Sequence, residues 1–438
     1  MGKLLTIIGA VILTSFYLFP FDFIFLSGVN TKLIMAVVSI AIVITNLARS
    51  RKGIIDKDIL LLCLFAFFVS FFTLFSVFYN NTRDYTYVTY IISMLVWTGG
   101  AYTLVTFIKW IHGKITVPIL TYYLIAACTM QCLLALAINR FSAVEDFCSS
   151  FCLGLSDIKR YINDGRLYGV GCVFDPAGLR FAAVLVLMGY FFPRIVEKYN
   201  KRNVLIIMYA FAFILISVVG NIISRTTIVG MIIALAYIII YSLRLHTLRI
   251  DIETNRLWKW MCFLLFVSIV LIIPLYHGDA SFREEIRFGF EGFFSLFEKG
   301  KWEVHSNNQL LTMYRFPETF KTWIVGDGYF FNTNLDPYYT GVEYKEYYMA
   351  IDVGYLRFIY YSGIIGLGAF ILFMCKVAVM CMFRHRECRM LFFLLLILQF
   401  VIWFKVASDI FCVFALFLVI EDVSVDENGL QKKSDIVD

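Results

Sequence analysis

Long apolar runs, separated by short polar connections, follow one another along most of the chain. A run of about 20 residues is long enough to cross a hydrocarbon core of roughly 30 Å as a helix. The pattern predicts twelve membrane-spanning helices, near residues 4–20, 31–48, 58–79, 86–108, 116–138, 178–193, 204–222, 226–243, 260–276, 353–375, 390–404 and 406–421. We therefore expect an all-α, polytopic membrane protein with one membrane domain over residues 1–421.

The composition supports this class. Hydrophobic residues make up 61% of the 438 residues and charged residues only 16%. Soluble globular domains carry about 25% charged residues, so an ordinary soluble protein is excluded. The first run follows Lys3 in the manner of a signal peptide, but it has no small-residue cleavage site, and we expect it to stay as an anchor.

Lys and Arg gather in alternate short connections, which lie within 49–57, 109–114, 194–202, 244–259 and 384–389. Because positive residues in short loops favour the cytoplasmic side, these connections predict the cytoplasmic face. Both termini then lie in the cytoplasm, with residues 422–438 as a polar tail. The formal charge of +6 is mostly a topology signal, and no basic stripe predicts nucleic acid as a partner.

Two connections on the opposite face are longer than a membrane crossing requires, at about 139–177 and 277–352. Ordered loops of this length are usually functional. Cys148, Cys152 and Cys172 lie in the first loop, where an oxidising compartment permits two of them to form a disulfide. We expect no metal site there, because no histidine lies near these cysteines.

Arginines beside apolar segments on this outer face are the sharpest chemical signal. A guanidinium next to lipid is costly unless an anion meets it, and its planar fork suits phosphate oxygens. Five such residues predict a site for the diphosphate of a lipid: Arg166, Arg180, Arg225, Arg315 and Arg357.

Two local patterns support a phosphate site. Asp175 and Pro176 predict the cap and first turn of the sixth span, and an outward-facing helix start can hold phosphate. The short turn 220–227 fixes Arg225 beside hydroxyl side chains. The alternatives are an ordinary capped span, with Arg166 reaching lipid headgroups, and an Arg225 that only marks the membrane interface.

The second long loop begins with apolar residues at helical spacing over 282–297, which predicts a helix in the headgroup plane. Three tyrosines further along, Tyr338, Tyr339 and Tyr344, are candidates for contacting a glycan. Aromatic faces beside polar amides suit sugars, although interfacial anchoring is the commoner use of tyrosine.

The order of four motifs resembles the O-antigen polymerase and O-antigen ligase superfamily of bacterial envelope polysaccharide synthesis. The motifs are Gly-Arg-x-x-Gly…Phe-Asp-Pro at 165–176, Ser-Arg-Thr at 224–226, Gly-x-Gly at 326–328 and Asp-x-Gly-Tyr-Leu…Gly-Ile-Ile-Gly at 352–366. Topology and motif order extend the resemblance over most of the chain. It implies a GT-C-like membrane fold in the bacterial inner (cytoplasmic) membrane.

The polymerases also carry, in each outer loop, an Arg and a Gly separated by ten residues. Arg315 and Gly326 have this separation, and so do Arg160 and Gly171, although Arg166 has the better local context. The sequence does not decide between Arg160 and Arg166.

The resemblance implies a metal-independent glycosyltransferase that needs no cofactor. A glycan on undecaprenyl diphosphate moves onto a lipid-linked repeat unit outside the cytoplasm, and the arginines neutralise the departing diphosphate. The partners implied are the undecaprenyl-diphosphate-linked oligosaccharide, membrane lipids, a chain-length regulator and a flippase.

The acceptor hydroxyl requires a general base. The candidates are Asp352, where the chain returns to the membrane, His305 with its near-neutral reference pKa, and Glu318. The alternatives are a helix cap for Asp352 and a solvated loop residue for His305.

Two other functions remain open. Ligases of the superfamily show a His-Asn pair before the last Gly-x-x-Gly, where this chain has Ile351-Asp352, yet His305 can supply that histidine from a shifted position. A lipid-linked oligosaccharide flippase would carry ionisable residues deep in the membrane. Lys405 and Asp409, four residues apart, are the clearest such pair, and we expect a structural ion pair on one helix.

Overall fold

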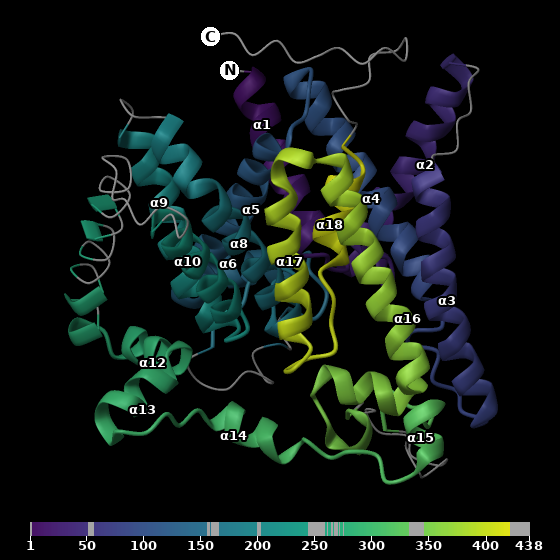
Figure 1. Cartoon of the computed structure of the whole chain (residues 1–438). Coiled ribbons are helices and arrows are strands. Elements are labelled where there is room, and N and C mark those ends of the chain that lie inside the picture. The colour runs from purple at the N-terminus through teal and green to yellow at the C-terminus, as the bar shows by residue number, and fades with distance from the viewer. Residues whose placement is uncertain are drawn as a thin grey trace.

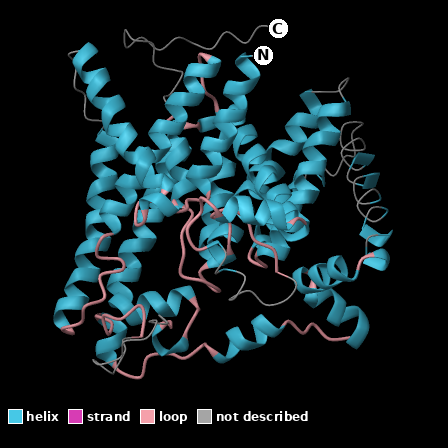
Figure 2. Cartoon of the chain, turned by 180° about the vertical axis from the view of Figure 1, so that it is seen from behind, coloured by secondary structure: helices cyan, strands magenta, loops and turns pink. Residues whose placement is uncertain are grey.

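The computed structural model describes residues 2–50, 57–155, 166–198, 203–243, 276–332 and 346–420, with Ile158 and isolated residues between 259 and 274. Within these ranges all regular secondary structure is helical, and β pairing is limited to isolated bridges (Figures 1 and 2). The all-α prediction is confirmed.

The main bundle is formed by apolar helices that pack side by side (Figure 1). They are α1 (Gly2–Leu18), α2 (Thr31–Ser50), α3 (Lys57–Tyr79), α4 (Tyr90–His112), α5 (Val117–Arg140), α8 (Phe174–Lys198), α9 (Asn203–Ile223), α10 (Thr227–Leu243), α16 (Gly354–Arg384), α17 (Arg389–Ile402) and α18 (Phe411–Leu418).

Among the described residues, seven helices are long and apolar enough to cross a membrane, namely α2, α3, α4, α5, α8, α9 and α16. The apolar helices α1 and α10 have 17 residues each, slightly less than a full crossing. The predicted span at 260–276 lies largely outside the described residues. The protein is therefore a helical membrane protein.

The last apolar run forms two short helices joined by an irregular segment. α17 has 14 residues and α18 has 8. The side chains of Gln399 and Trp403 form hydrogen bonds with the backbone of this linker. Both donate to the Ser408 carbonyl, at 3.0 and 2.8 Å. The Gln399 amide oxygen also accepts from the Ile410 N–H at 2.7 Å. Non-helical backbone inside a membrane protein requires such partners.

This irregular segment overturns the predicted pairing of Lys405 with Asp409. Lys405 lies in the linker, where it forms an ion pair of 3.6 Å with Asp175. Asp409 instead accepts hydrogen bonds from the Phe411 N–H at 2.9 Å and the Tyr90 hydroxyl at 3.4 Å. The spacing of four residues favours a pair only if both lie on one helix, which the linker prevents.

The loop helices lie at one end of the bundle, opposite the end where α1 begins (Figure 1). They are α6 (Ser142–Ser149), α12 (Ala280–Gly289), α13 (Glu291–Lys299), α14 (His305–Thr312) and α15 (Phe320–Ile324), with the short 3-10 turns η1 (Ile24–Leu26) and η2 (Tyr348–Ala350). A third 3-10 turn, η3 (Arg386–Cys388), connects α16 to α17. The helix predicted over 282–297 is present as two helices, α12 and α13, which meet at Phe290.

α8 lies in the core, and all residues from Phe181 to Met188 are fully buried. Its backbone approaches α10 closely, because a Cβ on Gly230 would lie 2.2 Å from the Ala182 carbonyl oxygen and one on Gly189 would lie 2.6 Å from the Ala234 Cβ. Small residues permit such close helix contacts in membranes. This packing fixes the start of α8 against the turn between α9 and α10.

The Gly-x-Gly motif at 326–328 attaches the loop to a kink in α16. The Asp327 N–H donates to the Tyr360 carbonyl at 2.6 Å, and the Gly328 N–H donates to the Tyr361 carbonyl at 3.2 Å. α16 turns at Gly363, whose φ of 67° lies in the left-handed region, and a Cβ there would lie 2.0 Å from the Ile324 carbonyl oxygen. Only glycine meets both requirements.

The cysteines of the first loop form no disulfide. Cys148, Cys152 and Cys172 are all buried free thiols. Cys148 and Cys152 pack in a small apolar cluster with Phe21 and Tyr168, while Cys172 belongs to the main core. They contribute to packing as small hydrophobic residues.

Candidate functional site

Asp175, at the start of α8, connects three segments of the chain. Its carboxylate accepts hydrogen bonds from the Ser224 hydroxyl at 2.9 Å and from the Thr226 hydroxyl. The Lys405 ammonium lies 3.6 Å from the same carboxylate and donates to the Thr226 hydroxyl at 3.0 Å. α8 begins one residue earlier, at Phe174, so Asp175 holds the turn between α9 and α10 instead of acting as the predicted helix cap.

Asp352 lies next to this group, in the segment between η2 and α16. Its Oδ1 is buried and has no hydrogen-bond partner among the described residues. The pKa of Asp352 is raised to about 6, because burial and the Asp175 charge together outweigh the opposing charges of Arg357 and Lys405. A carboxylate with a free oxygen and a near-neutral pKa has the properties of a general base. We call Asp175, Ser224, Thr226, Asp352 and Lys405 the carboxylate cluster.

Two arginines meet on one aromatic ring beside the carboxylate cluster. The guanidinium carbon of Arg225 lies 4.3 Å from the centre of the Phe288 ring, and that of Arg166 lies 5.2 Å from the same ring. The Arg166 Nε is buried and has no hydrogen-bond partner within the described part of the chain. Burial lowers the pKa of both arginines, and in Arg166 the Asp175 charge opposes this shift while the Arg225 charge adds to it.

Contacts with the second long loop fix the position of Arg225. Its Nε donates to the Phe288 carbonyl at 3.0 Å, and its Nη1 donates to the Ser306 hydroxyl at 3.0 Å. Its Nη1 also lies 2.8 Å from Glu291 Oε2. The other oxygen of Glu291 accepts the His305 N–H at 3.2 Å, so one ion pair connects the 224–226 turn with α13 and α14.

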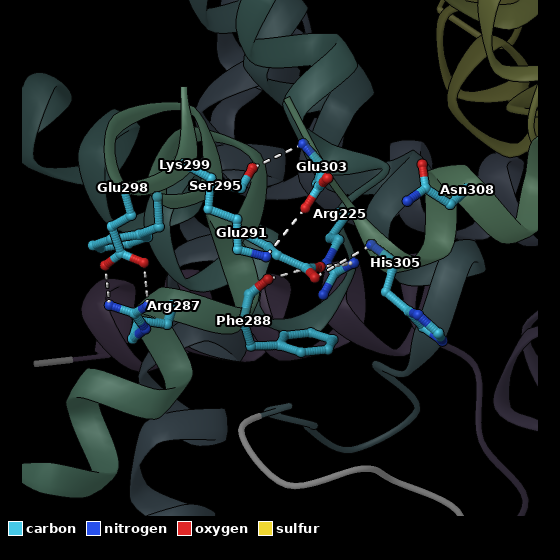
Figure 3. Close-up of a pocket in the computed structure, with 11 residues that line it drawn as sticks. Arg225, Arg287, Phe288, Glu291, Ser295, Glu298, Lys299, Glu303, His305 and Asn308 are labelled. Carbon is cyan, nitrogen blue, oxygen red and sulfur yellow. Dashed lines mark hydrogen bonds and ion pairs between the residues drawn. The ribbon is translucent and has the colours of Figure 1, made fainter. Parts of the chain in front are cut away.

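These contacts form one wall of a cavity of about 490 Å³ between the loop helices and the turn, shown in Figure 3. Arg225 and Glu291 point toward each other in its middle, and the pair of Arg287 and Glu298 lies at one side. The full lining is Arg225, Arg287, Phe288, Glu291, Phe294, Ser295, Glu298, Lys299, Glu303, His305 and Asn308. The mixture of charged, amide and aromatic groups suits a polar organic ligand.

The other candidate bases differ in position. His305 is exposed and lines the cavity. Glu318 is exposed in the loop before α15, and its carboxylate has no hydrogen bond or ion pair within the described ranges. Of the three candidates, only Asp352 lies in the carboxylate cluster.

Arg357 is enclosed by aromatic rings. Its guanidinium carbon lies 3.7 Å from the centre of the Phe330 ring and 3.6 Å from that of Tyr347, and its Nη2 donates to the Phe330 carbonyl at 3.3 Å. The residue is only 4% exposed. In this arrangement Arg357 joins the segment before α16 to the loop, and its charge acts on Asp352.

Arg180 and Arg315 lie apart from the Phe288 ring. Arg180 follows Asp175 by five residues and is therefore rotated by about 140° around α8. Its guanidinium approaches the rings of Trp97 at 5.7 Å and Phe19 at 5.9 Å. Arg315 is exposed, and its described hydrogen bonds use only its backbone: its N–H donates to the Met313 carbonyl at 2.8 Å, and its carbonyl accepts from the Tyr360 hydroxyl at 3.3 Å. The five predicted arginines thus do not form one group.

Lys405 is the cluster residue that the sequence interpretation missed. Its predicted partner was Asp409 on the same helix, which removed it from the list of site residues. The available signal was a single ionisable residue inside an apolar run, which in membrane proteins often marks function. Tyr338, Tyr339, Tyr344 and Arg160 lie outside the described residues.

Comparison with known proteins identifies no relative of this chain. No protein-family model, curated protein or solved structure matches this chain. Over the described residues, no three His, Cys, Asp or Glu side chains converge to form a metal site. Function has to be inferred from the motifs and from the geometry of Arg166, Arg225 and the carboxylate cluster.

Proposed function

We propose that this chain is a surface polysaccharide polymerase of the bacterial inner membrane, a glycosyltransferase with a twelve-span, GT-C-like fold and cytoplasmic termini. It transfers a glycan from undecaprenyl diphosphate to a lipid-linked repeat unit at the outer face. The main support is one observation: Arg166 and Arg225 converge on Phe288, beside an Asp352 carboxylate with a free oxygen.

In this proposal Arg166 and Arg225 stabilise the charge of the leaving group. Cleavage of the bond between the sugar and the diphosphate leaves the electron pair on the diphosphate, whose charge then needs stabilisation. A guanidinium pair meets this need, since each donates two N–H groups to phosphate oxygens. The Glu291 carboxylate forms an ion pair with the Arg225 guanidinium, so the diphosphate has to displace this carboxylate when it binds. Arg315 is exposed and Arg357 is enclosed, so both are weaker candidates for the same diphosphate.

Asp352 is the proposed general base. The acceptor hydroxyl gives its proton to the Asp352 carboxylate while its oxygen forms the new bond to the anomeric carbon. With a pKa of about 6 the carboxylate is mostly ionised at neutral pH and still basic enough to accept a proton. No cofactor is required in this scheme.

The cavity beside Arg225 is large enough to hold the sugar residues that are linked directly to the diphosphate. Its volume of about 490 Å³ lies in the range of small-molecule sites. Asn308 and His305 line it with side chains able to bond sugar hydroxyls. Tyr338, Tyr339 and Tyr344 remain candidates for contacting the glycan further out, and a chain-length regulator and a flippase remain proposed partners.

One observation favours an O-antigen ligase as the second candidate. His305 lines the cavity that contains Arg225, so a histidine base is available from the shifted position. A ligase would transfer the whole glycan once to a different acceptor. A flippase is the third possibility, and it would form no glycosidic bond.

The test uses purified protein in lipid nanodiscs with a lipid-diphosphate-linked repeat unit and no nucleotide sugar. We expect a ladder of products, its loss in Arg225→Ala, and an unchanged ladder in Arg283→Ala, an exposed arginine of α12 outside the cavity lining. Single transfer to a second acceptor would indicate a ligase. Transport of the intact repeat unit without any new bond would indicate a flippase.

A further inference from the structure

A second group of charged residues lies between the bundle helices, away from Phe288. It consists of Lys32 at the start of α2, Trp97 in α4, Arg180 in α8 and Asp409 just before α18, and we call it the Trp97 site. The two cations influence each other and Asp409 electrostatically. Four segments far apart in the sequence thus meet here.

Both cations lie against the same indole ring. The Lys32 ammonium is 4.5 Å from the centre of the Trp97 ring, and the Arg180 guanidinium carbon is 5.7 Å from it. Tyr17 supports the ring edge-on at 5.3 Å, and its single hydroxyl hydrogen is shared between the Cys412 carbonyl at 2.8 Å and the Trp97 carbonyl at 3.1 Å. The aromatic platform is therefore fixed by two other helices.

The charges at the Trp97 site are not balanced. Neither Lys32 nor Arg180 forms an ion pair with a carboxylate of the described residues, and the Asp409 oxygens accept from Phe411 and Tyr90 instead. Two cations beside a single carboxylate leave a net positive charge next to apolar helices. Such a charge is costly near hydrocarbon unless an anion approaches it.

The position fits the phosphate level of a membrane. Lys32 is the second residue of α2, and Arg180 lies six residues after the start of α8, about 9 Å along the helix axis. Both side chains are partly exposed, so a ligand can reach them. A cation that only marked the interface would extend into water, whereas both of these turn toward one indole.

We propose that Lys32 and Arg180 bind a phosphate group carried by a lipid, with the Trp97 ring as the wall of the site. The ammonium and the guanidinium both donate to phosphate oxygens, and the bound anion offsets the repulsion between them. This site is separate from the cavity at Arg225 and does not depend on the reaction proposed there. The lipid is either a bilayer phospholipid with a net negative charge or an isoprenoid phosphate, because a zwitterionic headgroup carries its own cation beside the phosphate.

The test measures lipid binding to the full-length protein in nanodiscs of phosphatidylcholine. Phosphatidylglycerol and undecaprenyl phosphate are titrated separately, with undecaprenol as the uncharged comparison. The readout is the part of the tryptophan fluorescence change on lipid addition that is present in the wild type and absent in Trp97→Phe. Native mass spectrometry of the bound lipid supports it. We expect saturable binding of at least one phosphate lipid and none of undecaprenol. The phosphate lipid that saturates the site identifies the source.

The variant Lys32→Gln/Arg180→Gln is expected to weaken binding at least tenfold. The matched variant Arg283→Gln/Lys301→Gln, which removes two exposed cations of the outer loop, is expected to leave it unchanged. If the double variant does not fold, each single variant should still weaken binding about threefold or more. Equal affinity in wild type and in the Lys32 and Arg180 variants, or equal binding of undecaprenol, would overturn the proposal.

Discussion

The Arg225 guanidinium lies 2.8 Å from Glu291 Oε2, and the other oxygen of Glu291 accepts the His305 N–H. The side chains of Arg225 and Glu291 are 16% and 33% exposed, so the pair is shielded only in part from water. Glu291 therefore supplies an anion where the proposed function needs a phosphate. If a phosphate displaces Glu291 from Arg225 as proposed, substrate binding is expected to move α13 and α14, which this pair connects to the 224–226 turn.

Replacing Glu291 by Gln should favour the phosphate. Arg225 keeps its charge but loses the competing carboxylate, and a partly exposed ion pair contributes about 1 kcal/mol. We expect a KM for the lipid-linked substrate about three- to tenfold lower, measured by product formation in nanodiscs. Glu298→Gln is the control, because Glu298 pairs with Arg287 in the same cavity. An unchanged or higher KM in Glu291→Gln would contradict the displacement.

Asp352 should determine the acidic limb of the pH–rate profile. Its pKa of about 6 means that the carboxylate is ionised above that pH and protonated below it. As a general base it should lose rate about tenfold per pH unit below pH 6. Asp352→Asn should lower kcat about 10²- to 10⁴-fold and abolish this limb. A limb that persists in the Asn variant would assign the base to another residue, with His305→Gln as the next variant to measure.

The same residue should reduce the stability of the fold at neutral pH. The folded pKa of about 6 lies above the reference value of 3.8, so the folded state binds the proton more tightly than the unfolded state. Between about pH 4 and pH 6 the free energy of unfolding therefore falls as pH rises, and it stays low above pH 6. Asp352→Asn should stabilise the protein at pH 7 by up to about 3 kcal/mol. Thermal unfolding in detergent should show a higher Tm at pH 7 and no gain at pH 4.

A double-mutant cycle should detect the coupling of Asp175 and Lys405. Their side chains are 28% and 27% exposed, and Thr226 bonds to both. We expect Lys405→Ala and Asp175→Ala to destabilise the fold by about 1–3 kcal/mol each, with a coupling energy of about 1 kcal/mol. Additive effects in thermal or denaturant unfolding would show that the contact contributes nothing to stability.

Gly363 and Gly368 offer a matched pair of substitutions on α16. Gly363→Ala places a Cβ 2.0 Å from the Ile324 carbonyl oxygen at a φ of 67°, whereas a Cβ on Gly368 meets no atom within 4 Å. We expect Gly363→Ala to destabilise by about 2–4 kcal/mol and Gly368→Ala to be neutral or stabilising by about 0.5 kcal/mol. Comparable Tm values for the two variants would exclude the close contact between α15 and α16.

Particular residues show where sequence reasoning succeeded and where it did not. The Ser-Arg-Thr turn at 224–226 and Asp352 were identified from local motifs, and they lie together with Asp175 in the structure. The sequence interpretation grouped Arg180 with Arg225, whereas in the structure Arg180 contacts Trp97 and Arg225 contacts Phe288, because the helical rotation of α8 turns Arg180 toward Trp97. A list of arginines on one side of a membrane contains no information about which helix face each one occupies.

The sequence by itself determined the helical membrane class, the long loops and the residue types available for phosphate chemistry. These properties follow from the length of apolar runs and from the charge of local segments, which depend only on neighbouring residues. The tertiary structure decided which charges meet: Lys405 with Asp175, Glu291 with Arg225, and Lys32 with Arg180 over Trp97. Such contacts depend on helix rotation, on the break between α17 and α18, and on packing between segments hundreds of residues apart, none of which a local pattern encodes.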